Sequence, residues 1–88
     1  MNSSPPPPRP PAWKTSYLAL VATLLRRRQE RCLGQAALAV QLGVSRRTLQ
    51  RWECGEAEPP AMRLFQWAAR LGVGIAPNVA QSGAGAAR

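Results

Sequence analysis

The chain has 88 residues, enough for one small domain. The sequence has twelve Lys and Arg residues and four acidic residues, giving a formal net charge of +8 and a pI near 11.6. This balance favours a polyanionic partner, nucleic acid before an anionic membrane surface. The chain has no His, and no nucleophile has a base beside it, so we expect neither an enzyme nor a metal site, and no cofactor.

Two cysteines, Cys32 and Cys54, are too few for a four-ligand zinc site without His, and their spacing is not a C-x-x-C redox motif. We expect reduced thiols in a cytoplasmic protein. No apolar run reaches the ~18 residues that a membrane-spanning helix needs. The N-terminus lacks the apolar stretch of a signal peptide.

Residues 1–14 contain six of the nine prolines. Proline fixes φ and lacks an amide donor, so the segment favours extended polyproline II over a helix. We interpret it as a disordered tail. The alternative is a ligand for a groove that binds polyproline.

The first helix is expected to begin near Thr15 or Ser16, either of which can cap it, and to end at Leu33-Gly34. Residues on one of its faces recur at spacings of three and four: Tyr17, Leu20, Val21, Leu24 and Arg28. Three further arginines fall mostly on its other faces, where we expect them to be solvated: Arg26, Arg27 and Arg31.

Two short helices follow, predicted over 35–42 and 46–53. Gly43 between them suits the left-handed conformation that ends a helix, and Ser45 suits the N-cap of the next. A last helix is predicted over 61–71, with Trp52 and Trp67 both expected in the core. After Ile75 little can pack, so we divide the chain into a domain over 15–75 and tails over 1–14 and 76–88.

Two short helices joined by a tight Gly-Val turn form the core of a helix-turn-helix. The small residue Ala39 allows the two helices to cross closely. The exposed face of the second helix then carries side chains that can reach base edges: Arg46, Arg47, Gln50 and Arg51.

The segment LGQAALAVQLGVSRRTLQRWECGEAEPP resembles the phage-repressor/Cro-type helix-turn-helix, or Xre family, and the likeness covers about residues 18–75. The resemblance implies an all-α fold, a small lambda-repressor-like bundle of four or five short helices. It also implies a homodimer on a palindromic operator. Gly34 departs from the family's usual Ser or Thr, and Glu56 and Glu58 stand where basic residues are common.

By this resemblance the exposed face of helix 46–53 contacts bases, and Arg28 forms a structural ion pair with Glu53. Gln35 lies at the start of a helix, where its side chain and amide can face a phosphate; simple helix capping is the alternative. We expect phosphate contacts from three residues in all: Gln35, Ser45 and Thr48.

The predicted function is a sequence-specific regulator of transcription, a repressor, that binds double-stranded DNA in a bacterial, phage or plasmid-encoded system. An antitoxin that represses its own operon shares every one of these features. Two other classes fit less well: a protein-interaction module without DNA binding, and a basic peptide at a membrane surface. No small-molecule ligand is indicated.

We expect a homodimer, because one helix-turn-helix covers only a few base pairs. Its interface is expected at the end of the last helix and just beyond, where three apolar residues exceed what the core needs: Phe65, Val73 and Ile75.

Overall fold

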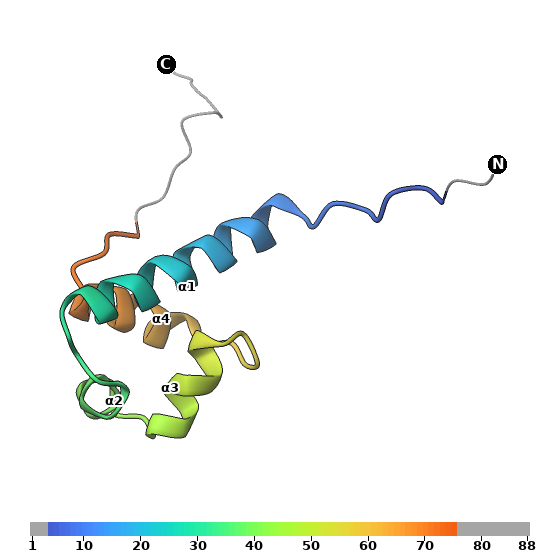
Figure 1. Ribbon diagram of the computed structural model, residues 1–88. Coiled ribbons are helices and arrows are strands. Elements are labelled where there is room, and N and C mark those ends of the chain that lie inside the picture. The colour runs from blue at the N-terminus through green and yellow to red at the C-terminus, as the bar shows by residue number, and fades with distance from the viewer. Residues whose placement is uncertain (1–3, 76–88) are drawn as a thin grey trace, which may run out of the picture.

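A computed structural model describes residues 4–75 of the chain. This part of the chain contains four helices and no strand, which confirms the predicted all-α class. The helices are α1 (Ala12–Glu30), α2 (Gln35–Leu42), α3 (Arg46–Glu53) and α4 (Ala61–Arg70) (Figure 1). None of these helices is long and apolar enough to cross a membrane. The predicted tail over 76–88 lies outside the described residues.

The prediction that α1 begins near Thr15 or Ser16 is wrong, because the helix begins at Ala12. Pro11 is its N-cap, and the Pro11 carbonyl accepts bonds from the amides of Lys14 and Thr15 at 3.0 and 3.1 Å. A residue before a proline avoids helical dihedrals, so the helix cannot extend back into the proline run. The end of that run fixes the start of α1, and no hydroxyl cap is required.

The end of α1 is closed by a reversal of the chain at Cys32, which has a φ of 53°. The amide of Cys32 donates to the Gln29 carbonyl at 3.0 Å, and that of Leu33 donates to the Arg28 carbonyl at 3.1 Å. This is the Schellman pattern, in which glycine usually holds the left-handed position. The reversal directs the chain from α1 into α2.

The turn between α2 and α3 has the predicted conformation. Gly43 adopts φ 70° and ψ 30°, and the amide of Val44 donates to the Ala39 carbonyl at 3.0 Å. Ser45 then caps α3, since its Oγ accepts a bond from the amide of Thr48 at 3.0 Å. These local bonds fix the angle between the two helices of the helix-turn-helix.

The core lies where all four helices meet, and Leu24, Leu38, Leu49 and Leu71 are fully buried in it. Trp52 and Trp67 pack together at its centre, with ring centroids 5.9 Å apart and planes inclined by 37°. Both tryptophans are buried, as predicted. Two large rings therefore fill much of the interior of a small domain.

Arginines from α1 and α4 tie the helices together through backbone carbonyls. Arg27 and Arg31 donate to the carbonyls of Leu71 and Arg70, at 3.1 and 3.2 Å. The prediction that Arg27 is simply solvated is therefore wrong, whereas Arg31 is exposed as predicted and makes a bond in addition. Arg63 similarly donates to the Leu42 carbonyl at 2.9 Å, at the end of α2. Each cation lies at the C-terminal end of a helix, where the helix dipole favours positive charge.

Replacing Trp52 by Ala should lower the free energy of unfolding by roughly 3–5 kcal/mol, because a buried aromatic ring is lost from a small core. Chemical denaturation of the full chain measures this. The control is Trp13→Ala, since Trp13 is 72% exposed and its loss should cost far less. Equal effects of the two substitutions would show that the described core is wrong.

Candidate nucleic-acid interface

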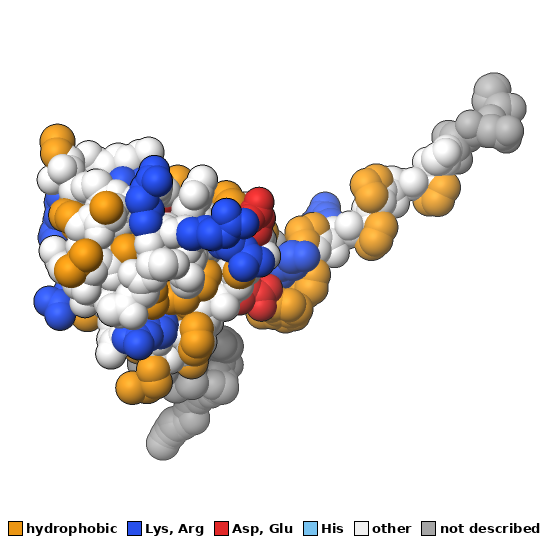
Figure 2. Space-filling view, turned by 90° about the horizontal axis from the view of Figure 1, so that it is seen from below, with side chains coloured by type: hydrophobic (Ala, Val, Ile, Leu, Met, Phe, Trp, Pro, Cys, Tyr) orange, Lys and Arg blue, Asp and Glu red, His pale blue; other side chains and the backbone are white. Residues whose placement is uncertain are grey.

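The outer face of α3 is formed by the four residues predicted to contact bases. All four are exposed, whereas Leu49 and Trp52 on the inner face are buried. Figure 2 views the molecule from below, the side on which α2 and α3 lie in Figure 1, and shows basic side chains spread over that face. Because α3 is anchored on one side, it presents cations and an amide on the other.

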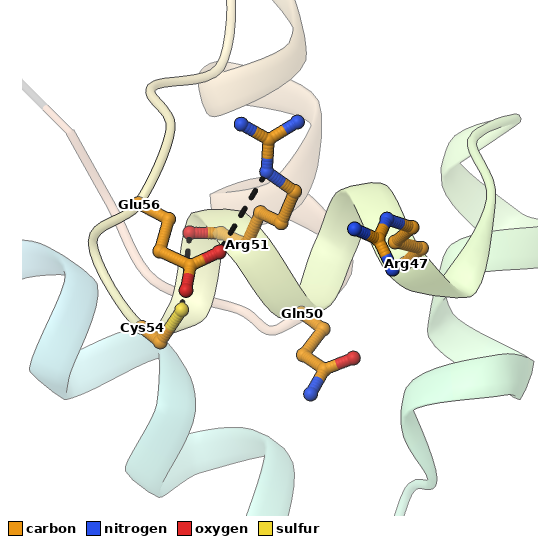
Figure 3. A pocket seen from close by; sticks show the side chains of 5 residues that line it. All are labelled: Arg47, Gln50, Arg51, Cys54 and Glu56. Carbon is orange, nitrogen blue, oxygen red and sulfur yellow. Dashed lines mark hydrogen bonds and ion pairs between the residues drawn. The ribbon is translucent and has the colours of Figure 1, made fainter.

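A shallow hollow of about 220 Å³ runs along this face of α3 (Figure 3). Its lining residues are Arg47, Gln50, Arg51, Cys54 and Glu56. Arg51 Nε lies 3.7 Å from a carboxylate oxygen of Glu56, and both side chains are at least half exposed. Exposed pairs of this kind contribute little to stability. Glu56 therefore competes weakly with any phosphate or base for Arg51.

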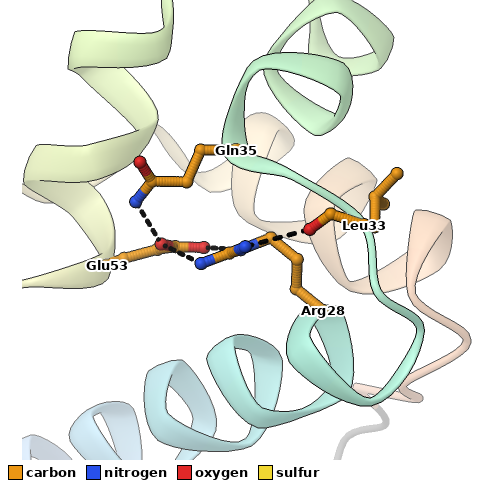
Figure 4. A network of polar contacts seen from close by, with 4 residues as sticks. All are labelled: Arg28, Leu33, Gln35 and Glu53. Atoms are coloured by element: carbon orange, nitrogen blue, oxygen red, sulfur yellow. Dashed lines mark hydrogen bonds and ion pairs between the residues drawn. The ribbon is translucent and has the colours of Figure 1, made fainter.

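Behind α3, a carboxylate with only 4% exposure connects three helices (Figure 4). Arg28 of α1 donates to both oxygens of Glu53, at 2.6 Å from Nε and 3.0 Å from Nη2. Arg28 Nη1 also donates to the Leu33 carbonyl at 2.9 Å. This two-pronged geometry is the strong form of a carboxylate–guanidinium contact. Arg28 and Glu53 are the pair that the family resemblance links.

Gln35, the first residue of α2, donates from its side-chain nitrogen to Glu53 Oε1 at 2.8 Å. It does not cap α2, whose N-cap is Gly34 without a side-chain bond. An amide nitrogen carries two hydrogens, so the second remains a donor for a further acceptor. Glu53 thus fixes the orientation of the Gln35 side chain beside the N-terminus of α2.

Ser45 and Thr48, the other two predicted phosphate contacts, bond to each other. Ser45 Oγ donates to Thr48 Oγ1 at 2.9 Å. This leaves the hydroxyl hydrogen of Thr48 available to a further acceptor. The pair lies at the start of α3, adjacent to Arg46 and Arg47.

Comparison with protein families gives one match. The family model for the helix-turn-helix, HTH_3, matches residues 24–77, more than half of the chain. The chain belongs to this helix-turn-helix family. It is thus a DNA-binding transcription regulator in the general sense of that family, as its sequence predicted. No curated protein matches the chain.

The three residues predicted at a dimer interface of this helix-turn-helix protein differ in exposure. Phe65 is 52% exposed, whereas Val73 and Ile75 are half-buried and pack against the core. Sequence reasoning overestimated the surface available from Val73 and Ile75, because the arginine bonds at the end of α4 hold the following segment close to α1.

Other predicted features of the helix-turn-helix protein can be placed on its surface. Cys32 and Cys54 are both free and exposed. Sequence reasoning did not identify Arg63, which fixes the end of α2 near the turn. The position of Arg63 in its helix does not indicate this role, because its partner is a backbone carbonyl 21 residues away in the sequence.

Replacing Arg28 by Met should lower the free energy of unfolding by about 3–5 kcal/mol, because Glu53 then loses its partner inside the protein. The matched control is Arg26→Met on the same helix. Arg26 lies 3.8 Å from Glu30, and both side chains are more than half exposed. Its loss should cost at most about 1 kcal/mol. Chemical denaturation measures the free energy of unfolding of both variants. Similar losses in the two would mean that the pair of Arg28 and Glu53 is not structurally important.

Proposed function

We propose that this protein is a sequence-specific transcription regulator, a repressor, that reads the DNA major groove with α3. The observation that supports this most is the outer face of α3, where exposed basic and amide side chains stand on a helix whose inner face is fixed in the core. A module without DNA binding would have no need to keep such a face.

Arginine can bond to both acceptors of guanine in the major groove, and glutamine pairs in the same way with adenine. Arg47 and Gln50 lie one turn apart on the same exposed face, and Arg46 and Arg51 flank them. We therefore expect a half-site with at least one G·C pair.

Phosphate contacts set the register of the protein on the duplex. The N-terminus of α2 presents unpaired backbone amides and the remaining hydrogen of the Gln35 side chain. Thr48 and the cap residue Ser45 stand in the first turn of α3, on either side of Arg46 and Arg47 in the sequence. Contacts at the starts of both helices would hold α3 in the groove from two sides.

Selection of bound sequences from random double-stranded DNA tests the proposal. The expected result is a defined motif made of two inverted half-sites, with centres roughly 34–36 Å apart along the DNA. Recovery of sequences without any shared motif would contradict sequence-specific binding. An antitoxin that represses its own operon would give the same motif, and the presence of a neighbouring toxin gene would favour that role.

Replacing Arg47 by Ala should relax base preference at one position of each half-site and weaken binding by roughly 1–3 kcal/mol. Gln35→Ala should instead weaken binding to all sequences alike, because a phosphate contact carries no base information. Repeating the selection and measuring affinities for matched and scrambled sites separates the two. Equal, uniform losses would show that the assigned roles are wrong.

We further propose that two copies bind a palindromic operator through an interface around Phe65, Val73 and Ile75. Phe65 is the most informative position, since Val73 and Ile75 also contact the core. Phe65→Asp should abolish dimers in sedimentation and leave the melting temperature nearly unchanged. Arg70→Gln, nearby and exposed, lowers the net charge by the same one unit and is the control. A dimer that survives Phe65→Asp would remove Phe65 from the interface.

A further inference from the structure

A second surface lies where the first turns of α1 face the loop that joins α3 to α4. It is a groove of about 350 Å³ lined by Trp13, Tyr17, Glu58, Pro59, Ala61 and Leu64. Trp13 and Tyr17 stand one helical turn apart, and Trp13 is 72% exposed. An exposed tryptophan beside a half-buried tyrosine is an apolar surface with polar ends, of the kind found at interfaces.

One of the residues that line the groove carries a polar group without a partner. Among residues 4–75, the Tyr17 hydroxyl is buried and makes no hydrogen bond. Burial, and secondarily the Glu58 carboxylate, raises the pKa of this hydroxyl, so it remains a donor at neutral pH. Buried tyrosine hydroxyls normally find partners.

The same chain carries a segment with matching chemistry. Residues 5–11 read PPPPRPP and are extended and exposed. At about 3.1 Å per residue in polyproline II they span roughly 20 Å. Their carbonyls are acceptors with no competing amides at the prolines, and such segments dock into grooves lined by aromatic side chains. Arg9 within the run can pair with Glu58, which is exposed at the groove.

The segment cannot easily reach the groove of its own chain. Pro11 caps α1 in an extended conformation, and residues 4–10 continue away from the bundle (Figure 1). A run of prolines is stiff and does not fold back over one helical turn. Figure 2 shows acidic, basic and apolar side chains together where this segment meets the body.

We propose that the proline-rich segment of one copy binds the Trp13–Tyr17 groove of a second copy, with Arg9 paired to Glu58. This rests on the proposed pairing of two copies and identifies a second contact between them. Two-fold symmetry makes the exchange reciprocal, so each protomer both gives and receives a segment.

Two charge reversals test the exchange in the full chain without DNA. Arg9→Glu and Glu58→Arg each place like charges opposite each other in a dimer of identical copies. Each variant alone should self-associate about tenfold more weakly than the original chain in sedimentation. An equimolar mixture of the two should recover association, because both contacts between unlike copies then join opposite charges.

Two controls separate this contact from others. Arg26→Glu makes the same charge change at the far end of α1 and should leave association unchanged. Trp13→Ala should weaken association like the charge reversals, with a normal melting temperature. If the mixture associates no better than its components, or if Trp13→Ala has no effect, the exchange is wrong.

Failure of the exchange and failure of the proposed pairing give different results. A dimer that is insensitive to Trp13→Ala but lost on Phe65→Asp overturns the exchange and keeps the pairing. A chain that stays monomeric at all concentrations, with and without operator DNA, overturns both. A groove that binds a synthetic peptide of residues 4–11 but gives no association of the full chain also overturns the exchange.

Discussion

The arrangement of the helices depends on one buried carboxylate. Glu53 lies in the last turn of α3 and is bonded to Arg28 of α1 and Gln35 of α2. An ionised group inside a protein is tolerated only when it is paired and hydrogen-bonded. The two helices of the helix-turn-helix therefore have to keep the distance and angle at which both donors reach Glu53. The bond between Glu53 and Gln35 also orients the Gln35 side chain, to which we assign a phosphate contact.

The positive charge of the chain has two separate uses. Arg27, Arg31 and Arg63 bond to carbonyls at helix ends, and Arg28 neutralises Glu53. These cations stabilise the bundle. The exposed arginines of α3 carry no such structural bonds to the core and can exchange solvent for DNA. Net charge alone therefore overstates how much of the protein is available to a polyanion.

The central part of this fold could be predicted from sequence because its signals are local. Gly43 sets the geometry of the turn and Ser45 that of the start of α3, each through bonds to residues only a few positions away. The start of α1 was missed because a capping rule favoured Thr15 or Ser16, whereas the end of the proline run decides it. The bonds of Arg27 and Arg63 join residues that are 44 and 21 positions apart. The spacing of apolar residues along a helix does not reveal contacts between distant positions. The bond from Gln35 to Glu53 was missed for the same reason, since these residues are 18 positions apart.

The burial of the Glu53 pair gives folding and DNA binding different sensitivities to ionic strength. Dissolved ions screen exposed charges over about 8 Å at physiological concentration, but screen a buried pair much less. On the proposed function, contacts from the outer face of α3 would release condensed counterions from DNA, so added salt would oppose them directly. The bundle can thus stay folded while its hold on DNA changes by orders of magnitude. If the proposed function holds, the ionic composition of the cell would act on how much of the DNA site is occupied and leave the folded domain intact.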